Sequence, residues 1–327
     1  MNILGIESSC DDTSAAILTD EGVKSNIIAS QSIHIKFGGV VPELASRAHQ
    51  KTISQTVDQA LNEADSKIED IDLIAVTQGP GLMGSLLVGL CFAKGVSLSK
   101  NIPIVGVNHM DAHIYANFID EKPEFPFVCL TVSGGHTQLV LVKAPFDHEI
   151  LGQTRDDAAG EAFDKIGKII GLPYPAGPEI DRLSKEGDPK FHKFPQALVN
   201  EGLEFSFSGL KTSALYYLQD KSEEWKKEHL NDISASISEA ITEVLIKKLK
   251  RAVKQTGVKS FAIAGGVSAN SMLRAKAKQM AGDLDLNLHI PHITYCTDNA
   301  AMIAITGKMM AEQGKYDDLS MRPFASI

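Results

Sequence analysis

FVCLTVSGGHTQLVLVK, residues 127–143, is the stretch that decides the fold. Two arms rich in apolar and β-branched residues, 127–132 and 138–142, flank the turn Ser133-Gly134-Gly135-His136-Thr137. Arms of this kind around a glycine-containing loop are typical of a β-hairpin. The adjacent glycines lack a Cβ, so the backbone of this turn can approach a ligand closely. By itself the stretch fits a plain hairpin better than a ligand loop, because Gly-Gly is ordinary turn chemistry.

The same plan occurs once before in the chain. Residues 2–18, NILGIESSCDDTSAAIL, consist of an apolar arm, the polar turn Glu7–Thr13 and a second apolar arm. The two hairpins lie more than a third of the 327-residue chain apart, which is too far for a solenoid repeat and predicts a duplicated domain. By itself the doubly acidic first turn reads as a solvated turn. Paired with the turn at 133–137, it predicts a nucleotide cleft between two similar domains.

Composition limits the class of protein. A length of 327 residues, with 43% hydrophobic and 22% charged residues, indicates an ordinary soluble protein of about two domains. No apolar run reaches the roughly 18 residues of a membrane span, and the acidic N-terminus is unlike a secretory signal. Four dispersed cysteines favour a reducing cytoplasm. The net charge of -9 means that nucleic-acid binding would need local basic patches or a partner.

The order of expected elements is that of an α/β fold. Pro42 is expected at the start of a long helix, and a hinge is expected at 119–126. The expected strands are 72–77, 104–107, 205–211 (ending in a turn), 261–266 and 288–290, and the expected helices are 82–97, 160–170, 179–185, 230–256 and a last one from Asp298 to about 313. The predicted domains are residues 1–120 with 299–327, and residues 121–298.

One pair of histidines has the spacing of metal ligands. His109 and His113 are four residues apart on an expected helix, so both face one way. Asp298 is a candidate third ligand, and as an alternative or in addition it is the N-cap of the last helix. Two imidazoles and a carboxylate suit non-haem iron or zinc. Met110 occupies the place where the zinc-peptidase pattern has a glutamate, which argues against a peptidase.

A third glycine junction completes the pattern. Residues 264–270, AGGVSAN, lead from an expected strand into a helix, which places backbone N–H groups at a ligand or allows close packing. Two strand–turn–strand loops and a distal Gly-Gly helix start resemble the sugar kinase, actin and heat-shock ATPase fold. In that fold the hairpins hold phosphates and the third loop holds adenosine.

Ten motifs give a specific resemblance to the universal tRNA threonylcarbamoyladenosine transferase family, in its bacterial branch. They span nearly the whole chain in order: ESSCDDT (7–13), GGVVPELASRAH (38–49), QGPGLMGSL (78–86), NHMDAH (108–113), VSGGHT (132–137), AGEAFDK (159–165), YPAGPEID (174–181), FSFSGLKT (205–212), AGGVSAN (264–270) and YCTDNAAMIA (295–304).

The resemblance implies a reaction and its residues. The threonylcarbamoyl group of threonylcarbamoyl-AMP moves to N6 of adenosine 37 in tRNAs that read codons beginning with A, and AMP leaves. The implied substrate-binding residues are Val132, Ser133, Gly134, Gly135 and His136 for the phosphate and carbamoyl region, and Asp164, Gly177, Asp181 and Asn270 for the adenosine side. His109, His113 and Asp298 are implied to hold one divalent metal, iron by resemblance or else zinc. Asp11 is our candidate for positioning or deprotonating the amine.

The resemblance also implies partners. The bacterial family works with an inactive paralogue of TsaB type and a small ATPase of TsaE type, so we expect a heterodimer or larger complex. The helices at 43–64 and 82–97 are the expected contact surfaces. Two alternatives stay open: an ATPase or kinase of the same fold with ATP or ADP in the cleft, and a non-catalytic nucleotide-binding scaffold. The histidine pair and the full VSGGH turn argue against the scaffold.

Overall fold

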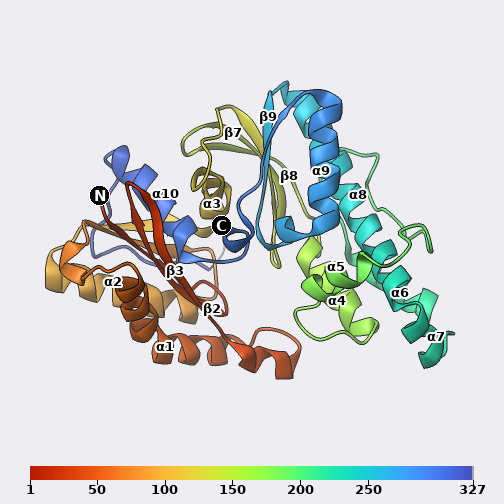
Figure 1. Ribbon diagram of the computed structural model, residues 1–327, viewed down its shortest axis with the longest axis horizontal. Coiled ribbons are helices and arrows are strands. Elements are labelled where there is room, and N and C mark those ends of the chain that lie inside the picture. The colour runs from red at the N-terminus through yellow and green to blue at the C-terminus, as the bar shows by residue number, and fades with distance from the viewer. Residues whose placement is uncertain (326–327) are drawn as a thin grey trace. The chain divides into compact units, whose positions relative to one another are not determined.

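The computed structural model describes residues 1–325, which divide into two compact units (Figure 1). Unit 1 comprises Met1–Lys122 and the chain from Pro291 onward, and unit 2 is Pro123–Ile290. The chain first passes from unit 1 to unit 2 between Lys122 and Pro123, inside the expected hinge. The chain returns to unit 1 at Pro291, eight residues before the expected boundary after residue 298, so residues 291–298 belong to unit 1. Asp298 contacts His109 and His113, which also belong to unit 1.

Unit 1 is built on a five-stranded sheet in the order β3-β2-β1-β4-β5. Its strands are β1 (Ile3–Glu7), β2 (Asp12–Thr19), β3 (Gly22–Ser30), β4 (Leu73–Gly79) and β5 (Ile104–Asn108). β1–β2–β3 form an antiparallel meander, whereas β4 and β5 extend the sheet in parallel. Every residue of β1 is buried, as expected for a central strand covered by helices on both faces.

Unit 2 repeats this sheet strand for strand, in the order β10-β9-β6-β7-β8. Its strands are β6 (Phe127–Val132), β7 (Thr137–Ala144), β8 (Asp147–Gln153), β9 (Ser260–Ala264) and β10 (Asn287–His289). The hairpin β6–β7 is antiparallel and β9 pairs in parallel with β6, so β6 takes the place that β1 has in unit 1. The duplicated α/β fold predicted from the two hairpins is confirmed.

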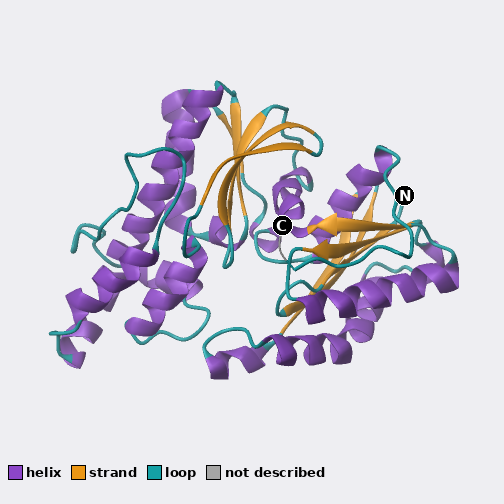
Figure 2. Ribbon diagram, turned by 180° about the vertical axis from the view of Figure 1, so that it is seen from behind, coloured by secondary structure: helices purple, strands orange, loops and turns teal. Residues whose placement is uncertain are grey.

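Helices cover the sheets (Figure 2). Unit 1 contains α1 (Pro42–Glu63), α2 (Met83–Lys100), α3 (His109–Tyr115) and α10 (Ala300–Glu312); unit 2 contains α4 (Ala159–Ile169), α5 (Gly177–Ser184), α6 (Ser208–Leu218), α7 (Glu223–Glu228), α8 (Leu230–Thr256) and α9 (Ser271–Leu284). Short 3-10 turns lie at Ser32–Phe37, Ile68–Asp70, Ala116–Phe118, Gly266–Ala269 and Ile293–Tyr295. No helix in the part of the chain that the structure describes is both long and apolar enough to cross a membrane.

The alternation of β1 side chains divides the core of unit 1 into two layers. Leu4 and Ile6 pack with residues of α1 and α2, while Ile3 packs with residues of α10 on the opposite face. This arrangement fixes the register of β1, because a slip by one residue would exchange the two faces.

The local structure differs from the sequence-based expectations at three places. Phe205–Lys211 is no strand: Phe205 makes one isolated bridge and α6 begins at Ser208. The edge strands β3 and β8 were missed because their alternation is broken by polar residues on the exposed face. Asp298 is not the N-cap of the last helix, because Asn299 takes that position and accepts the Met302 N–H at 3.0 Å.

Gly265 is a point of close backbone approach in unit 2. Its φ of +85° and ψ of 165° belong to a region that is essentially restricted to glycine, and a Cβ there would collide with the carbonyl of Val132 in β6. This glycine therefore sets how closely the β9–α9 junction approaches the start of the β6–β7 turn.

Gly265→Ala is expected to lower the free energy of unfolding by about 2–4 kcal/mol, through backbone strain and the collision. Gly282→Ala is the matched control, since Gly282 lies in α9 with open space around it, and it should stabilise by about 0.5–1 kcal/mol. Chemical denaturation of both variants measures the difference. Equal stability of the two would refute the packing role of Gly265.

The first residue of β2 gives unit 1 a pH-dependent stability. Burial raises the pKa of Asp12 to about 6, against the hydrogen bond from Ser30 and with the help of the neighbouring Asp11 charge. The protonated form therefore favours the folded state, and this contribution is present below about pH 4 and lost as the pH rises through about 6.

Asp12→Asn is expected to raise the free energy of unfolding by about 1–3 kcal/mol at pH 8 and to leave it unchanged near pH 4. Urea titrations at several pH values measure this difference. A gain of equal size at both pH values would show that burial of the charge is not its cause.

Candidate active site

The histidine pair lies at the carboxyl end of β5. Asn108 ends that strand and caps α3, with its side chain accepting the N–H groups of Met110 and Asp111 at 2.8 and 3.3 Å. The helix therefore starts at His109, and the four-residue spacing turns His109 and His113 to one side. Their ring centroids lie 4.7 Å apart, edge to face.

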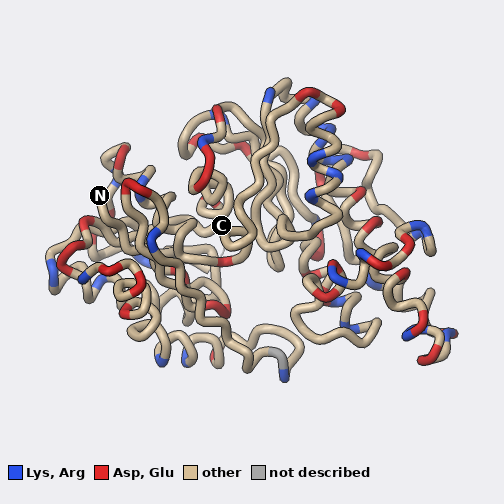
Figure 3. Tube along the Cα trace, viewed as in Figure 1, with Lys and Arg blue, Asp and Glu red and all other residues tan. Residues whose placement is uncertain are grey.

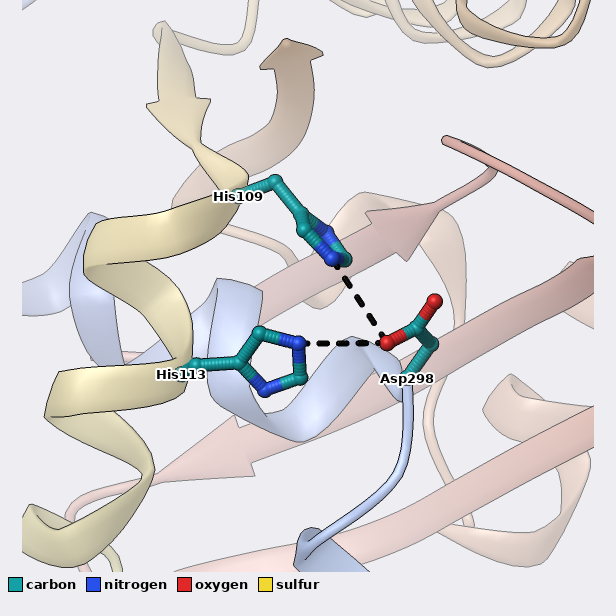
Figure 4. A group of neighbouring side chains, drawn as sticks. All are labelled: His109, His113 and Asp298. Atoms are coloured by element: carbon teal, nitrogen blue, oxygen red, sulfur yellow. Dashed lines mark ion pairs between the residues drawn. The ribbon is translucent and has the colours of Figure 1, made fainter. Parts of the chain in front are cut away.

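Asp298 meets both imidazoles from the far end of the chain (Figure 4). Its Oδ1 lies 3.2 Å from Nε2 of His113 and 3.5 Å from Nε2 of His109. One ligand atom from each of the three residues lies within 4.8 Å of the others. The structure thus brings together the three residues that the sequence analysis selected as a metal site.

The donor set fits a transition metal. His113 is fully buried, and neither of its ring nitrogens makes a hydrogen bond, although Nε2 faces Asp298. Buried polar atoms left in this way cost free energy unless a ligand satisfies them. Donors about 2.0–2.1 Å from a zinc ion lie roughly 3.3 Å apart in a tetrahedron, close to the separations from Asp298. Imidazole and carboxylate together suit iron or zinc.

Glu7, which ends β1, stands behind His109. Its Oε2 lies 3.1 Å from Nδ1 of His109, and the carboxylate also accepts from Ser9 N and from the Thr77 hydroxyl, both at 2.5 Å. Burial lowers the pKa of His109, but the charges of Glu7 and Asp298 outweigh it and raise this pKa to about 9. For Glu7, burial acts to raise the pKa, and the His109 charge and hydrogen bond bring it below its ordinary value.

The β6–β7 turn is a tight loop with an open outer side. Ser133 N donates to the His136 carbonyl at 2.8 Å, and His136 N donates to the Ser133 hydroxyl at 3.1 Å. Gly134 and Gly135 are exposed, and a Cβ on either would meet open space. Packing within the described protein therefore does not explain these two glycines. α4 closes the inner side, where a Cβ at Gly160 would come within 2.5 Å of the Ser133 carbonyl oxygen.

Two of the other predicted substrate residues, Asp164 and Asp181, form hydrogen bonds that link neighbouring helices of unit 2. Asp164 of α4 accepts from Ala176 N at 2.7 Å, just before α5 begins at Gly177. Asp181 of α5 accepts from both the N–H and the hydroxyl of Ser271 at 2.8 Å, at the first residue of α9. These carboxylates hold the helix starts in place.

Asn270 belongs to the same group. It caps α9 by accepting Leu273 N at 2.9 Å, and it follows the Gly265–Ala269 junction beside β6. Gly160 near the start of α4 approaches Ser133, and Gly265 before α9 approaches Val132, so both segments lie at the end of β6.

Sequence reasoning missed Glu7 as a neighbour of the metal site. A carboxylate that directly follows a wholly apolar strand was an available signal, since burial of such a charge requires partners. No spacing rule connects Glu7 with His109 or Thr77, which lie 102 and 70 residues away. Asp11, the candidate catalytic residue, lies half-buried in the turn between β1 and β2.

The basic residues of α8 do not form one solvated surface. Figure 3 shows Lys and Arg gathered on α8 and α9. Lys248 is fully buried and donates to the carbonyls of Leu198, Glu201 and Gly202, and Arg251 donates to Gly202 and Val199. These two cations hold the loop 198–202. Lys250 and Lys254 of α8 take no part in these hydrogen bonds to the loop.

Comparison with known proteins agrees with the motifs. The family described as tRNA N6-adenosine threonylcarbamoyltransferase matches residues 22–305. A curated protein of that name from Prosthecochloris aestuarii is 51% identical over 100% of this chain and 99% of its own. Another from Chloroherpeton thalassium is 54% identical over 96% of this chain and 93% of its own.

A solved structure supports the fold. T. kodakarensis HypF aligns with 95% of this chain and 48% of its own, with a TM-score of 0.65 at 14% identity, a likeness of fold alone. The two matched sheets identify that fold as actin-like. With the family match over residues 22–305 and about half of all residues identical to full-length relatives, the chain belongs to the tRNA N6-adenosine threonylcarbamoyltransferase family.

Proposed function

We propose that this protein transfers the threonylcarbamoyl group of threonylcarbamoyl-AMP to N6 of adenosine 37 in tRNAs that read codons beginning with A. The observation that carries the proposal is the full-length similarity to curated transferases of that name. The meeting of His109, His113 and Asp298 in unit 1 supports it, because a non-catalytic scaffold has no need of such a group.

The reaction sets three tasks. The adenosine amine attacks the carbamoyl carbon, a C–N bond forms, the C–O bond to phosphate breaks, and AMP leaves with the electron pair. The protein must therefore hold the AMP, stabilise charge on the carbamoyl oxygen, and accept the proton that the amine loses.

The β6–β7 turn is the proposed holder of the phosphate and carbamoyl groups, through Val132, Ser133, Gly134, Gly135 and His136. Its support is the open outer side of the two glycines. Asp164, Gly177, Asp181 and Asn270 are the proposed adenosine side. Because Asp164 and Asp181 each bind backbone N–H groups at helix starts, we assign them to shaping this region.

His109, His113 and Asp298 are the proposed ligands of one divalent metal, iron or zinc. Such an ion supplies Lewis-acid polarisation and an anchor for substrate oxygens. The chain's own part is to orient the two imidazoles on α3 and to bring Asp298 to them.

The direct test is the transfer of labelled threonylcarbamoyl from its adenylate to an anticodon stem-loop, with and without the partner proteins. We expect label on the adenosine together with AMP. A related ATPase or kinase would instead release ADP or phosphate without RNA. Failure of transfer in every combination of partners would overturn the proposed function.

Asp11 is the proposed acceptor or guide of the amine proton. Asp11→Asn is expected to slow single-turnover transfer by about 10²–10⁴-fold, with adenylate binding unchanged. Asp58→Asn, at an exposed position of α1, is the control and should transfer at the normal rate. A loss of less than about tenfold for Asp11→Asn would reject this role.

We propose α2 as the surface that binds a TsaB-type paralogue, within a complex that also includes a TsaE-type ATPase. Met83, Leu87 and Leu98 are 43%, 43% and 72% exposed and share one side of α2 with the exposed Cys91. An apolar stripe of this kind favours a protein partner. Of the described residues, α1 contributes no large exposed apolar side chain, so α2 is the stronger of the two predicted helices.

Leu87→Glu is expected to weaken binding of the bacterial paralogue by about 10–100-fold, because the charge would be buried in an apolar contact. Leu215→Glu is the matched control, since Leu215 is 48% exposed on α6 of unit 2. Calorimetric titration measures both affinities. Equal affinity of Leu87→Glu and the unchanged protein would move the interface elsewhere.

We propose a cytoplasmic location. Its support is that Cys10, Cys91, Cys129 and Cys296 are all free thiols, as in reducing compartments, and that tRNA is the proposed substrate.

A further inference from the structure

The carboxylate of Glu7 is buried and hydrogen-bonded through both of its oxygens. It is entirely buried, Oε1 accepts from Ser9 N, and Oε2 accepts from the Thr77 hydroxyl and faces Nδ1 of His109. These contacts come from the turn after β1, from β4 and from α3. Three separate elements therefore hold one carboxylate against one imidazole.

This contact decides which ring nitrogen of His109 keeps its hydrogen when a metal binds. Nδ1 faces two oxygens, Glu7 Oε2 at 3.1 Å and Ser9 Oγ at 3.3 Å. An ionised carboxylate only accepts hydrogen bonds, so Nδ1 must be the donor. The lone pair available to a metal is then on Nε2, the atom that lies 3.5 Å from Asp298.

His113 has no equivalent support. Both of its ring nitrogens are buried without a hydrogen-bond partner. The pair is therefore unequal: Glu7 faces Nδ1 of His109, whereas His113 faces a carboxylate only at Nε2, that of Asp298.

We propose that Glu7 is a positioning residue that raises metal affinity at His109, His113 and Asp298 by holding His109 with hydrogen on Nδ1 and Nε2 toward the ion. The inference rests on the metal site of the proposed function. A carboxylate behind a metal-binding histidine fixes its ring and increases its basicity, and loss of such a partner typically weakens metal binding by about 10–100-fold.

Glu7→Gln is the sharpest change, because it keeps the size of the side chain. The amide has one acceptor oxygen where the carboxylate has two. Whichever way it turns, its NH₂ group faces a donor, either Ser9 N–H or the His109 and Thr77 side. At least one buried contact is lost in either orientation, and both orientations remove the negative charge that faces the Nδ1–H of His109.

The test is competition for Zn²⁺ between the purified protein and a chromophoric chelator, together with the visible spectrum of the Co²⁺-loaded protein. Glu7→Gln is expected to bind Zn²⁺ about 10–100-fold more weakly and to change the Co²⁺ bands. Ser9→Ala is the matched control, since it keeps the backbone N–H that Glu7 accepts and should weaken Zn²⁺ binding less than about threefold. Thermal melts of the metal-free proteins report folding separately.

Two further variants separate the possible failures. His113→Ala tests the metal site itself: unchanged Zn²⁺ affinity there would overturn that site whatever Glu7 does. If Glu7→Gln does not fold, Thr77→Val decides, because it removes one hydrogen bond to the same carboxylate and should weaken Zn²⁺ binding about two- to tenfold. Metal affinity lost in His113→Ala but unchanged in the folded Glu7→Gln, or in Thr77→Val, would refute the role of Glu7.

Discussion

The contact of His109 with two carboxylates is the constraint on which the architecture of unit 1 depends. Glu7 lies at the end of the first strand and Asp298 just before the last helix, and both reach the same imidazole. A buried imidazole between two carboxylates is stable only where each charge has partners. Here Ser9 and Thr77 donate hydrogen bonds to Glu7, and His113 faces Asp298. The site thus ties the beginning, the middle and the end of unit 1 together.

The duplicated sheet explains how such distant residues meet. In both units the strand that starts the hairpin, β1 or β6, lies at the centre of the sheet, with the parallel strand β4 or β9 beside it. Because the two strands of each pair are parallel, the turns that follow them lie at the same edge of their sheet. The unit 1 copy places Glu7 and α3 at that edge. The unit 2 copy places the Ser133–His136 turn and the Gly265 junction there.

Local signals were sufficient for the fold and for part of the site. Two hairpins with glycine or acidic turns predicted the duplication, and the His109–His113 spacing on a helix after a buried strand predicted a shared face. The role of Asp298 as ligand candidate agrees with its position, although Asn299 caps α10 in its place. The partners of Glu7 and Lys248 were not predictable, because they lie 102 and about 50 residues away and only tertiary packing brings them together. Edge strands β3 and β8 were missed for a related reason, since their exposed faces lack a regular apolar pattern.

Anomalous X-ray diffraction from crystals of the zinc-loaded protein tests the central claim most directly, namely that α3 and the residue before α10 form a metal centre. The account predicts one strong zinc peak within bonding distance, about 2.0–2.2 Å, of His109 Nε2, a ring nitrogen of His113 and the Asp298 carboxylate, and its loss in Asp298→Ala. A zinc peak away from these three residues, or none at saturating zinc in a protein that still transfers threonylcarbamoyl, would contradict it.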